Sequence, residues 1–223
     1  MRTGNKLRVL LNWVGRIALL VLGSFVMTFG ISAVASSDLG NTPISALPYT
    51  AAALSGLTFG TTTFIVNMCF LALQILILRK KFRLYNLLQV PAVFVFGCFI
   101  DISMGILSSL EMPAWPYAGK VAASVAGSFI LACGIALSIQ SRTILQPGEA
   151  MVLSVHEVTG VPFSTLKIFN DVTLVCLACV LGWAASGEII GVREGTVFSA
   201  VLVGLFLKAL SWAARRASLM REK

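Results

Sequence analysis

The chain has 223 residues, of which 57% are hydrophobic and 12% are charged, and its mean hydropathy is +0.91. This composition excludes a water-soluble domain and predicts an all-α integral membrane protein whose main partner is the lipid bilayer. The formal net charge of +8 does not indicate nucleic-acid binding, because the Lys and Arg residues cluster beside apolar runs, as they do at cytoplasmic flanks of membrane helices.

Six apolar runs are long enough to cross the hydrocarbon core of a bilayer, which takes about 20 helical residues. In chain order they cover residues 10–35, 60–78, 86–108, 118–140, 162–182 and 195–212. The first run is too long for the core of a signal peptide and no cleavage site follows it, so we expect it to be retained as a membrane span.

Two shorter segments, 43–57 and 147–160, interrupt this series. Each begins with a proline, which suits the first turn of a helix. The glycines Gly56 and Gly160 stand where a helix C-terminus is expected. About 15 residues make a helix of about 22 Å, short of the ~30 Å hydrocarbon core. We therefore expect two re-entrant half-helices that are buried in protein.

The chain also contains an internal repeat. Residues 22–77 match residues 126–181 at a fixed shift of 104 positions, with 12 identities in 56 aligned positions. The repeat predicts two related units, residues 1–110 and 111–223, in a single membrane domain. Such duplications in membrane proteins often form the halves of a transporter, with a substrate site between them.

Charge placement predicts how the two units are oriented. If the short segments turn back, each unit crosses the membrane three times, and of the 17 Lys and Arg residues only Lys120 and Arg193 lie outside. If the short segments span, six basic residues lie outside. Cytoplasmic loops carry an excess of Lys and Arg, so three crossings are favoured. Units with an odd number of crossings are inverted relative to each other, and both termini are then cytoplasmic.

The starts of the half-helices are the first candidate site. Two positive helix ends that point at one place would attract an anionic or dipolar solute. Capping of the helix and contact with a solute both explain the side chains there. Glu149 in the first turn is either a cap or a proton or cation site. The candidate substrate-binding residues of this region are Asn41, Thr42, Pro43, Gln146, Pro147 and Glu149.

Polar residues within the spans add further candidates. Asn67 and Asp171 occupy equivalent positions in the two units, Asn170 adjoins Asp171, and Lys167 stands one helical turn before it. A structural ion pair and a functional site both explain Lys167 and Asp171. Four residues are candidates for proton or ion coupling, and all four also have a structural explanation: Glu149, Asp171, His156 and Asp101.

The sequence favours neither an enzyme nor a cofactor protein. One histidine with two nearby glutamates is too little for a metal site. No phosphate-binding loop, nucleophile–base pair, haem motif or flavin motif is present. The five cysteines stand in apolar runs, and we expect them to be buried as small hydrophobic residues. We therefore expect no catalytic residue, no cofactor and no metal.

Several short motifs resemble a known family. Leu39-Gly40-Asn41-Thr42-Pro43 and Gly56-Leu57-Thr58-Phe59-Gly60 resemble the "LGxxP … TGxSxG" pattern of the YitT/YczE-type bacterial multi-pass membrane proteins. The segments 96–101 and 193–196 resemble further signatures of that group, and the similarity covers about residues 15–210. It implies a location in the bacterial inner membrane but no substrate. Many members resemble Pro-Trp-Asp where this chain has Pro43-Ile44-Ser45, so a carboxylate remains only in the second unit.

These observations predict a membrane transporter or channel for a small solute or ion, with its site between the two half-helices. A transporter is preferred because polar residues are sparse and no polar stripe follows any span. Two alternatives remain open: a non-transporting scaffold or regulatory protein, and a lipid-handling protein with a groove open to the bilayer. The sequence also leaves open whether the chain forms a homo-oligomer.

Overall fold

The computed structural model describes the backbone of residues 2–221 and the side chains of residues 13–213. Within this part every regular element is helical, and three short 3-10 helices lie in the connections: η1 (Arg79–Lys81), η2 (Leu84–Leu88) and η3 (Met112–Ala114). The α-helices are α1 (Arg2–Ser36), α2 (Pro43–Ser55), α3 (Phe59–Leu78), α4 (Gln89–Ser108), α5 (Tyr117–Ser141), α6 (Pro147–Thr159), α7 (Phe163–Ser186) and α8 (Glu194–Arg221).

Six helical stretches are long and apolar enough to cross a membrane. They are Trp13–Ser36, Phe59–Lys81, Leu84–Ser108, Tyr117–Ser141, Phe163–Ser186 and Glu194–Ala213. Each coincides with one of the six runs expected from the sequence, so the prediction of an all-α protein with six candidate spans is confirmed. The basic residues near both chain ends, on which the cytoplasmic assignment of the termini partly rests, lie outside the described side chains.

Helices α1 and α5 cross closely because glycines stand at their contact. A Cβ atom on Gly30 would lie 2.7 Å from the carbonyl oxygen of Gly127, and one on Gly127 would lie 3.0 Å from the oxygen of Gly30. Further along the same crossing, a Cβ on Gly23 would lie 3.1 Å from the oxygen of Gly134. Small residues at such positions let membrane helices approach backbone to backbone.

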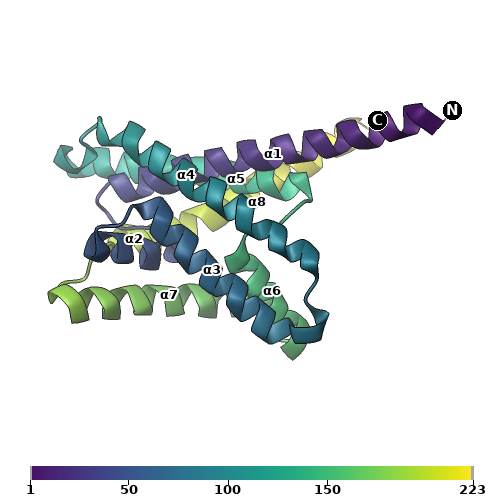
Figure 1. Cartoon of the computed structure of the whole chain (residues 1–223). Helices are drawn as coiled ribbons and strands as arrows, with labels where there is room; N and C mark the ends of the chain where they lie inside the picture. The colour runs from purple at the N-terminus through teal and green to yellow at the C-terminus, as the bar shows by residue number, and fades with distance from the viewer. Residues whose placement is uncertain (1, 222–223) are drawn as a thin grey trace.

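The short helices α2 and α6 have the boundaries that the sequence predicts. Each has 13 residues and begins with proline, and the left-handed residue that ends each is Gly56 (φ 71°) or Gly160 (φ 73°). Helix α2 packs mainly on α7 and α3, whereas α6 packs on α3 and α7. In Figure 1, α2 lies between the layer that contains α1 and the long helix α7, and α6 stands beside one end of α7.

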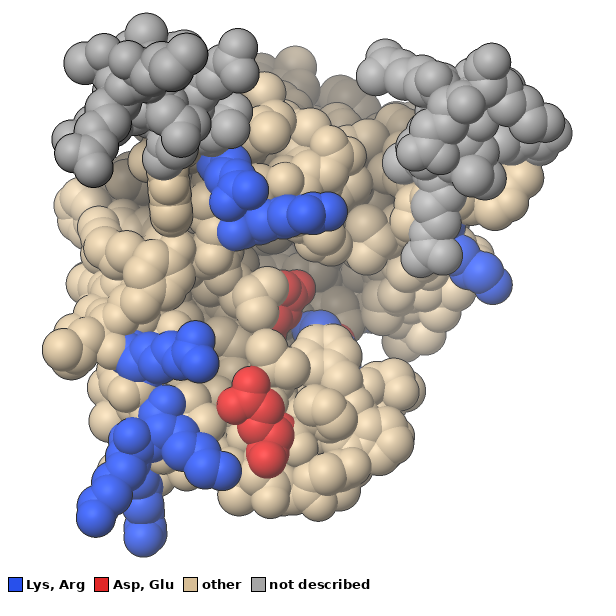
Figure 2. Space-filling model, turned by 90° about the vertical axis from the view of Figure 1, so that its right-hand side faces the viewer, with Lys and Arg blue, Asp and Glu red and all other residues tan. Residues whose placement is uncertain are grey.

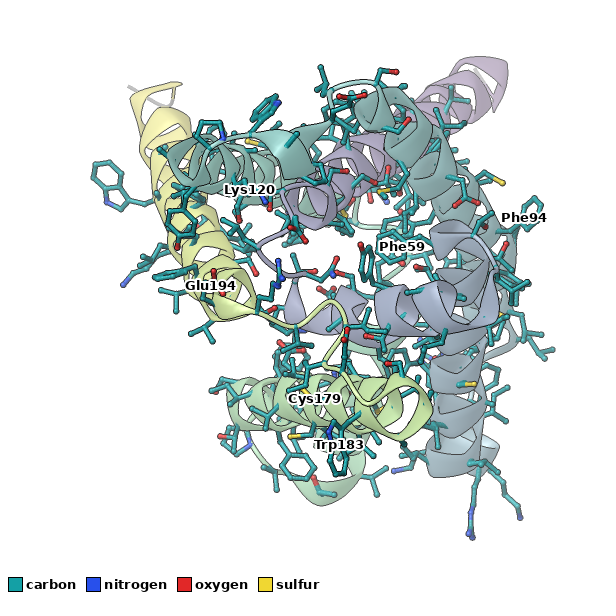
Figure 3. The ribbon with its side chains drawn as sticks, turned by 90° about the vertical axis from the view of Figure 1, so that its left-hand side faces the viewer. Phe59, Phe94, Lys120, Cys179, Trp183 and Glu194 are labelled. Carbon is teal, nitrogen blue, oxygen red and sulfur yellow. The ribbon has the colours of Figure 1, made fainter. Side chains whose placement is uncertain are left out.

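Apolar side chains divide between the interior and the outer surface of the bundle. Phe59 is buried and meets Tyr49 edge to face, with ring centroids 5.4 Å apart. Figure 3 shows Phe59 among the helices, whereas Phe94 and Trp183 point outward. Phe94 is 60% exposed and Trp183 is 70% exposed, which suits helices that face lipid. The outer surface also explains why the expectation of buried cysteines is wrong for Cys69, Cys98 and Cys176, which are exposed.

At one end of the bundle, two basic side chains converge on one aspartate. Lys120 Nζ lies 3.1 Å from a carboxylate oxygen of Asp38, and an Arg193 nitrogen lies 3.0 Å from the other. Arg193 also donates a hydrogen bond of 2.7 Å to the backbone carbonyl of Asp38. These two basic residues are the ones that the charge count places outside. The opposite end carries both chain ends in Figure 1.

Candidate functional site

A cavity of about 340 Å³ lies at the centre of the bundle. All eight α-helices contribute to its lining, and its walls combine an apolar part with a polar part. The apolar part includes Met27, Ile31, Phe96, Ile100, Leu131 and Ile135, and the polar part includes Thr42, Ser45, Thr63, Asn67, Gln146, Glu149, Lys167, Asp171 and Ser199. Cavities of this size and mixed character hold small molecules in other proteins.

The starts of α2 and α6 meet at this cavity. A Cβ atom on Gly148 in the first turn of α6 would lie 3.0 Å from Cδ1 of Ile44 in the first turn of α2. Pro43 lines the cavity, and Pro147 is almost completely buried beside it. The first N–H groups of a helix have no acceptor within the helix. Proline has no N–H, and the Ser45 N–H donates to the Thr42 carbonyl at 3.0 Å. The remaining first-turn donors of the two helices lie close together in the interior.

The side chains at the two starts do not cap their helices. The side chains of Thr42 and Gln146, the residues before the first turns, accept no hydrogen bond from the backbone of their helices. The Thr42 hydroxyl is hydrogen-bonded to the hydroxyl of Ser45 instead. Since capping was the main alternative to a binding role for these residues, their positions on the cavity wall favour contact with a solute.

The lining residues come in pairs that the sequence repeat relates. Positions 42, 45, 63 and 67 of the first unit correspond to positions 146, 149, 167 and 171 of the second, at the same shift of 104. The first unit contributes Thr, Ser, Thr and Asn, whereas the second contributes Gln, Glu, Lys and Asp. One side of the cavity is therefore neutral and hydrogen-bonding, and the other side carries all the charges.

Two of the three charges neutralise each other. Lys167 Nζ donates a hydrogen bond of 2.7 Å to Asp171 Oδ1, one helical turn away, and both side chains are less than one-third exposed. Asn170 is buried beside them, with its Nδ2 3.5 Å from the same oxygen. Glu149 forms no ion pair within the part of the chain whose side chains are described. The cavity is thus left with one unpaired carboxyl group.

Asn67 occupies the neutral side, where it donates a hydrogen bond of 2.8 Å to the backbone oxygen of Thr63. Its amide oxygen remains an acceptor for a further donor. The sequence pointed to Asn67 and to the difference between Ser45 and its equivalent Glu149, but it did not single out Thr63. The equivalence of Thr63 to Lys167 in the repeat is the signal that would have found it.

Pro147 and Asn170 stand beside the central cavity without lining it, and three further candidate residues lie away from it. Asp101 binds the start of α3: its carboxylate accepts hydrogen bonds of 2.7 Å from the Gly60 N–H and from the Thr58 hydroxyl. His156 Nδ1 lies 2.7 Å from the Val161 carbonyl, across the end of α6. Asn41 binds the Gly191 carbonyl through its side chain and its backbone N–H, both at 3.0 Å. These contacts give each of the three a structural role.

Among the described residues, no group of three or more His, Cys, Asp and Glu side chains is arranged to hold a metal ion. The expectations that the chain is no enzyme and needs no metal or cofactor remain predictions. The geometry nevertheless defines what the central cavity offers: apolar walls, helix starts that donate hydrogen bonds and one unpaired carboxyl group. These features suit binding of a small solute with both polar and apolar parts.

Comparison with known proteins places the chain among membrane proteins. The family described as "Family of unknown function (DUF6198)" matches residues 14–211. The "Uncharacterized membrane protein YczE" of Bacillus subtilis (strain 168) is 24% identical over 187 residues, which cover 83% of this chain and 80% of that protein. No solved structure matches the chain. The chain therefore belongs to the DUF6198 family and to the YczE-type membrane proteins, as its motifs indicated.

Proposed function

We propose that the protein is a transporter of the bacterial inner membrane for a small dipolar solute with an apolar part. In this proposal two inverted units enclose the substrate site, and α2 and α6 are re-entrant half-helices. The observation that carries the proposal is the central cavity at which the starts of α2 and α6 meet. Transporters with inverted repeats use broken or half-helices in this way to hold substrate near the middle of the bilayer.

Two sets of contacts support the inversion. At the crossing of α1 and α5, Gly30 meets Gly127 and Gly23 approaches Gly134, so the two equivalent helices run antiparallel. The aromatic pairs are also repeated: Phe25 meets Phe99 edge to face at 5.3 Å, and Phe129 meets Phe206 edge to face at 5.4 Å. Phe25 and Phe129 are equivalent at the shift of 104, and Phe99 and Phe206 are equivalent when three residues are inserted in the second unit. These paired contacts are those that a two-fold axis in the membrane plane would produce, whereas among the described residues the packing of α3 on α4 has no counterpart of similar extent between α7 and α8.

The inversion can be tested by cysteine labelling in intact cells. The five native cysteines are first replaced by serine, and single cysteines are introduced as Lys81→Cys and Ala114→Cys. We expect a membrane-impermeant maleimide to label position 114 and to leave position 81 unlabelled until the cells are opened. External labelling of position 81 would contradict the inverted arrangement and place the two units in the same orientation.

The charges of the cavity support a dipolar solute. A helix start is equivalent to about +0.5 elementary charge, and α2 has no acidic residue in its first turn. At α6 the carboxylate of Glu149, when it is ionised, turns a similar positive end into about −0.5. The Lys167–Asp171 pair adds no net charge. The cavity is therefore positive towards α2 and negative towards α6, which favours a solute with an anionic and a cationic group.

The cavity also argues against a purely structural scaffold. A scaffold whose repeat is only structural is expected to be tightly packed at the two helix starts, whereas a cavity of about 340 Å³ lies there. Of the four candidate residues for ion coupling, Glu149 and Asp171 line this cavity. We therefore place any proton or ion coupling at these two carboxyl groups, and we propose neither a catalytic residue nor a cofactor.

Three solutes that share an isobutyl group test the proposal. Leucine carries both charged groups, isopentylamine carries only the cationic group and 4-methylpentanoate carries only the anionic group. Binding of each to the purified full-length protein is measured by isothermal titration calorimetry in detergent. We expect leucine to bind at least about tenfold more tightly than either analogue, since each lost charge-assisted hydrogen bond costs about 1.5–3 kcal/mol. Equal affinities, or binding of none of the three, would contradict the dipolar site.

A further inference from the structure

A second cavity, separate from the central one, lies at the end of the bundle that carries both chain ends. Its volume is about 560 Å³, and it is enclosed by the end of α3, the connection to α4, the residues before α6 and one face of α6. Helix α6 divides the two cavities, because Glu149 lines the central cavity and Ala150 lines the second. Figure 2 shows this end of the molecule, where basic side chains stand around a hollow and acidic side chains lie within it and at its rim.

Two buried glutamines line the second cavity with oxygen atoms that have no partner. Gln74 and Gln89 are each only 3% exposed. Their side-chain oxygens accept no hydrogen bond from any described residue, and both side chains face the cavity. A buried acceptor without a donor costs about 1–3 kcal/mol. A ligand that brought hydrogen-bond donors into the cavity would remove this cost at both positions.

The repeat indicates that the fold itself does not require an amide at position 74. The equivalent position of the second unit is Ala178, which is completely buried. A methyl group therefore satisfies the packing there, while the first unit places a polar side chain into a cavity. Since burying a polar group without a partner is unfavourable, the amide of Gln74 is better explained by a ligand than by packing.

The charged side chains of the second cavity define the ligand further. Lys81 and Arg83 line it, and neither takes part in an ion pair within the described side chains. Glu157 and Tyr85 also line it, so the formal charge is +1 when Tyr85 is neutral. Lys and Arg are common phosphate ligands, and Arg can bind two phosphate oxygens at once.

We infer that this second cavity binds a phosphate ester whose alcohol part carries free hydroxyl groups. The phosphate lies against Lys81 and Arg83, and the hydroxyl groups donate to the side-chain oxygens of Gln74 and Gln89. This chemistry occurs in the headgroup of phosphatidylglycerol and in soluble glycerol phosphate. The inference rests on the second cavity alone and stands or falls independently of transport through the central one.

Binding is tested on the purified full-length protein by calorimetry with sn-glycerol 3-phosphate, inorganic phosphate and glycerol. Lipid preference is measured in parallel by native mass spectrometry of protein exposed to equal amounts of phosphatidylglycerol and phosphatidylethanolamine. The variants Gln74→Leu and Gln89→Leu remove one acceptor each. The control Gln140→Leu changes an exposed glutamine that lines neither cavity.

We expect glycerol phosphate or phosphatidylglycerol to bind, and each acceptor variant to weaken binding about fivefold, which corresponds to one hydrogen bond of about 1 kcal/mol. Without ligand, the acceptor variants should unfold at the same or a higher temperature, because each removes an unsatisfied oxygen. Gln140→Leu should not change binding. Binding of the soluble compound without a lipid preference identifies a metabolite site, and the reverse result identifies a lipid site.

The exposed residues Lys81 and Arg83 allow a second test that does not disturb the interior. Lys81→Gln and Arg83→Gln should each weaken phosphate binding at least about fivefold, whereas Lys80→Gln, in the same exposed segment but off the cavity, should not. The inference is overturned if neither glycerol phosphate nor phosphatidylglycerol binds. It is also overturned if the glutamine and basic variants bind as tightly as the natural protein.

Discussion

Replacing Glu149 by glutamine tests the unpaired carboxyl group of the central cavity. The substitution keeps the shape of the side chain and removes its charge, and no ion pair of the described residues is broken by it. If the cationic group of a dipolar solute binds Glu149, the variant loses a charge-assisted hydrogen bond of about 1.5–3 kcal/mol. This corresponds to a loss of affinity for leucine of about ten- to 150-fold.

Stability should change little in the same variant, which allows the affinity to be interpreted. Glu149 stands in the first turn of α6, where a carboxylate stabilises a helix by about 0.3–1 kcal/mol. For a chain of this size, 1 kcal/mol corresponds to about 2–4 °C in Tm. The matched control is Glu111→Gln, which changes an exposed glutamate in the connection between α4 and α5.

Calorimetry on both variants and the natural protein decides the question. The account predicts a large loss of leucine affinity in Glu149→Gln, none in Glu111→Gln and a Tm within about 4 °C for both. Unchanged affinity in Glu149→Gln would refute the assignment of the negative end of the site. An equal loss in both variants would show that surface charge, rather than the cavity, determines binding.

Two further substitutions test the Lys167–Asp171 ion pair of the cavity and the close crossing of α1 and α5. Asp171→Asn leaves Lys167 without its partner. Because the two side chains are 27% and 29% exposed, we expect the free energy of unfolding to fall by about 2 kcal/mol, a value between those of surface and buried ion pairs. Adding Lys167→Gln should restore part of this stability, measured by thermal unfolding. Gly30→Ala should destabilise the protein by about 1–3 kcal/mol, because the new Cβ would lie 2.7 Å from the Gly127 oxygen. Gly15→Ala in the same helix, where nothing lies within 4 Å of the new Cβ, should leave the Tm unchanged or raise it. Equal effects of the two alanines would contradict the close crossing of α1 and α5.

The helix boundaries could be predicted because they depend on local chemistry. Proline at positions 43 and 147 suits the first turn of a helix, and glycine at positions 56 and 160 adopts the positive φ that ends one. The six candidate spans followed equally directly from the length of the apolar runs. The repeat then brought Thr42, Asn67, Glu149 and Asp171 forward as candidates, and all four line one cavity.

Contacts between distant segments could not be predicted in the same way. Asp101 could equally have been an ion-coupling residue, because only the folded chain brings it to the start of α3. The close crossing at Gly30 and the cavity beside Gln74 likewise depend on how helices pack. A sequence pattern shows which face of a helix is apolar, but it does not show which backbone approaches that face.

Uptake into proteoliposomes distinguishes transport from binding alone. The purified protein is reconstituted, and radiolabelled leucine is followed into vesicles that contain the natural protein, Glu149→Gln, Glu111→Gln or no protein. The account predicts uptake above the protein-free rate for the natural protein and for Glu111→Gln, and strongly reduced uptake for Glu149→Gln. If leucine binds to the purified protein but enters all four kinds of vesicle at the same rate, the cavity binds a ligand without transporting it, and the transporter proposal is contradicted.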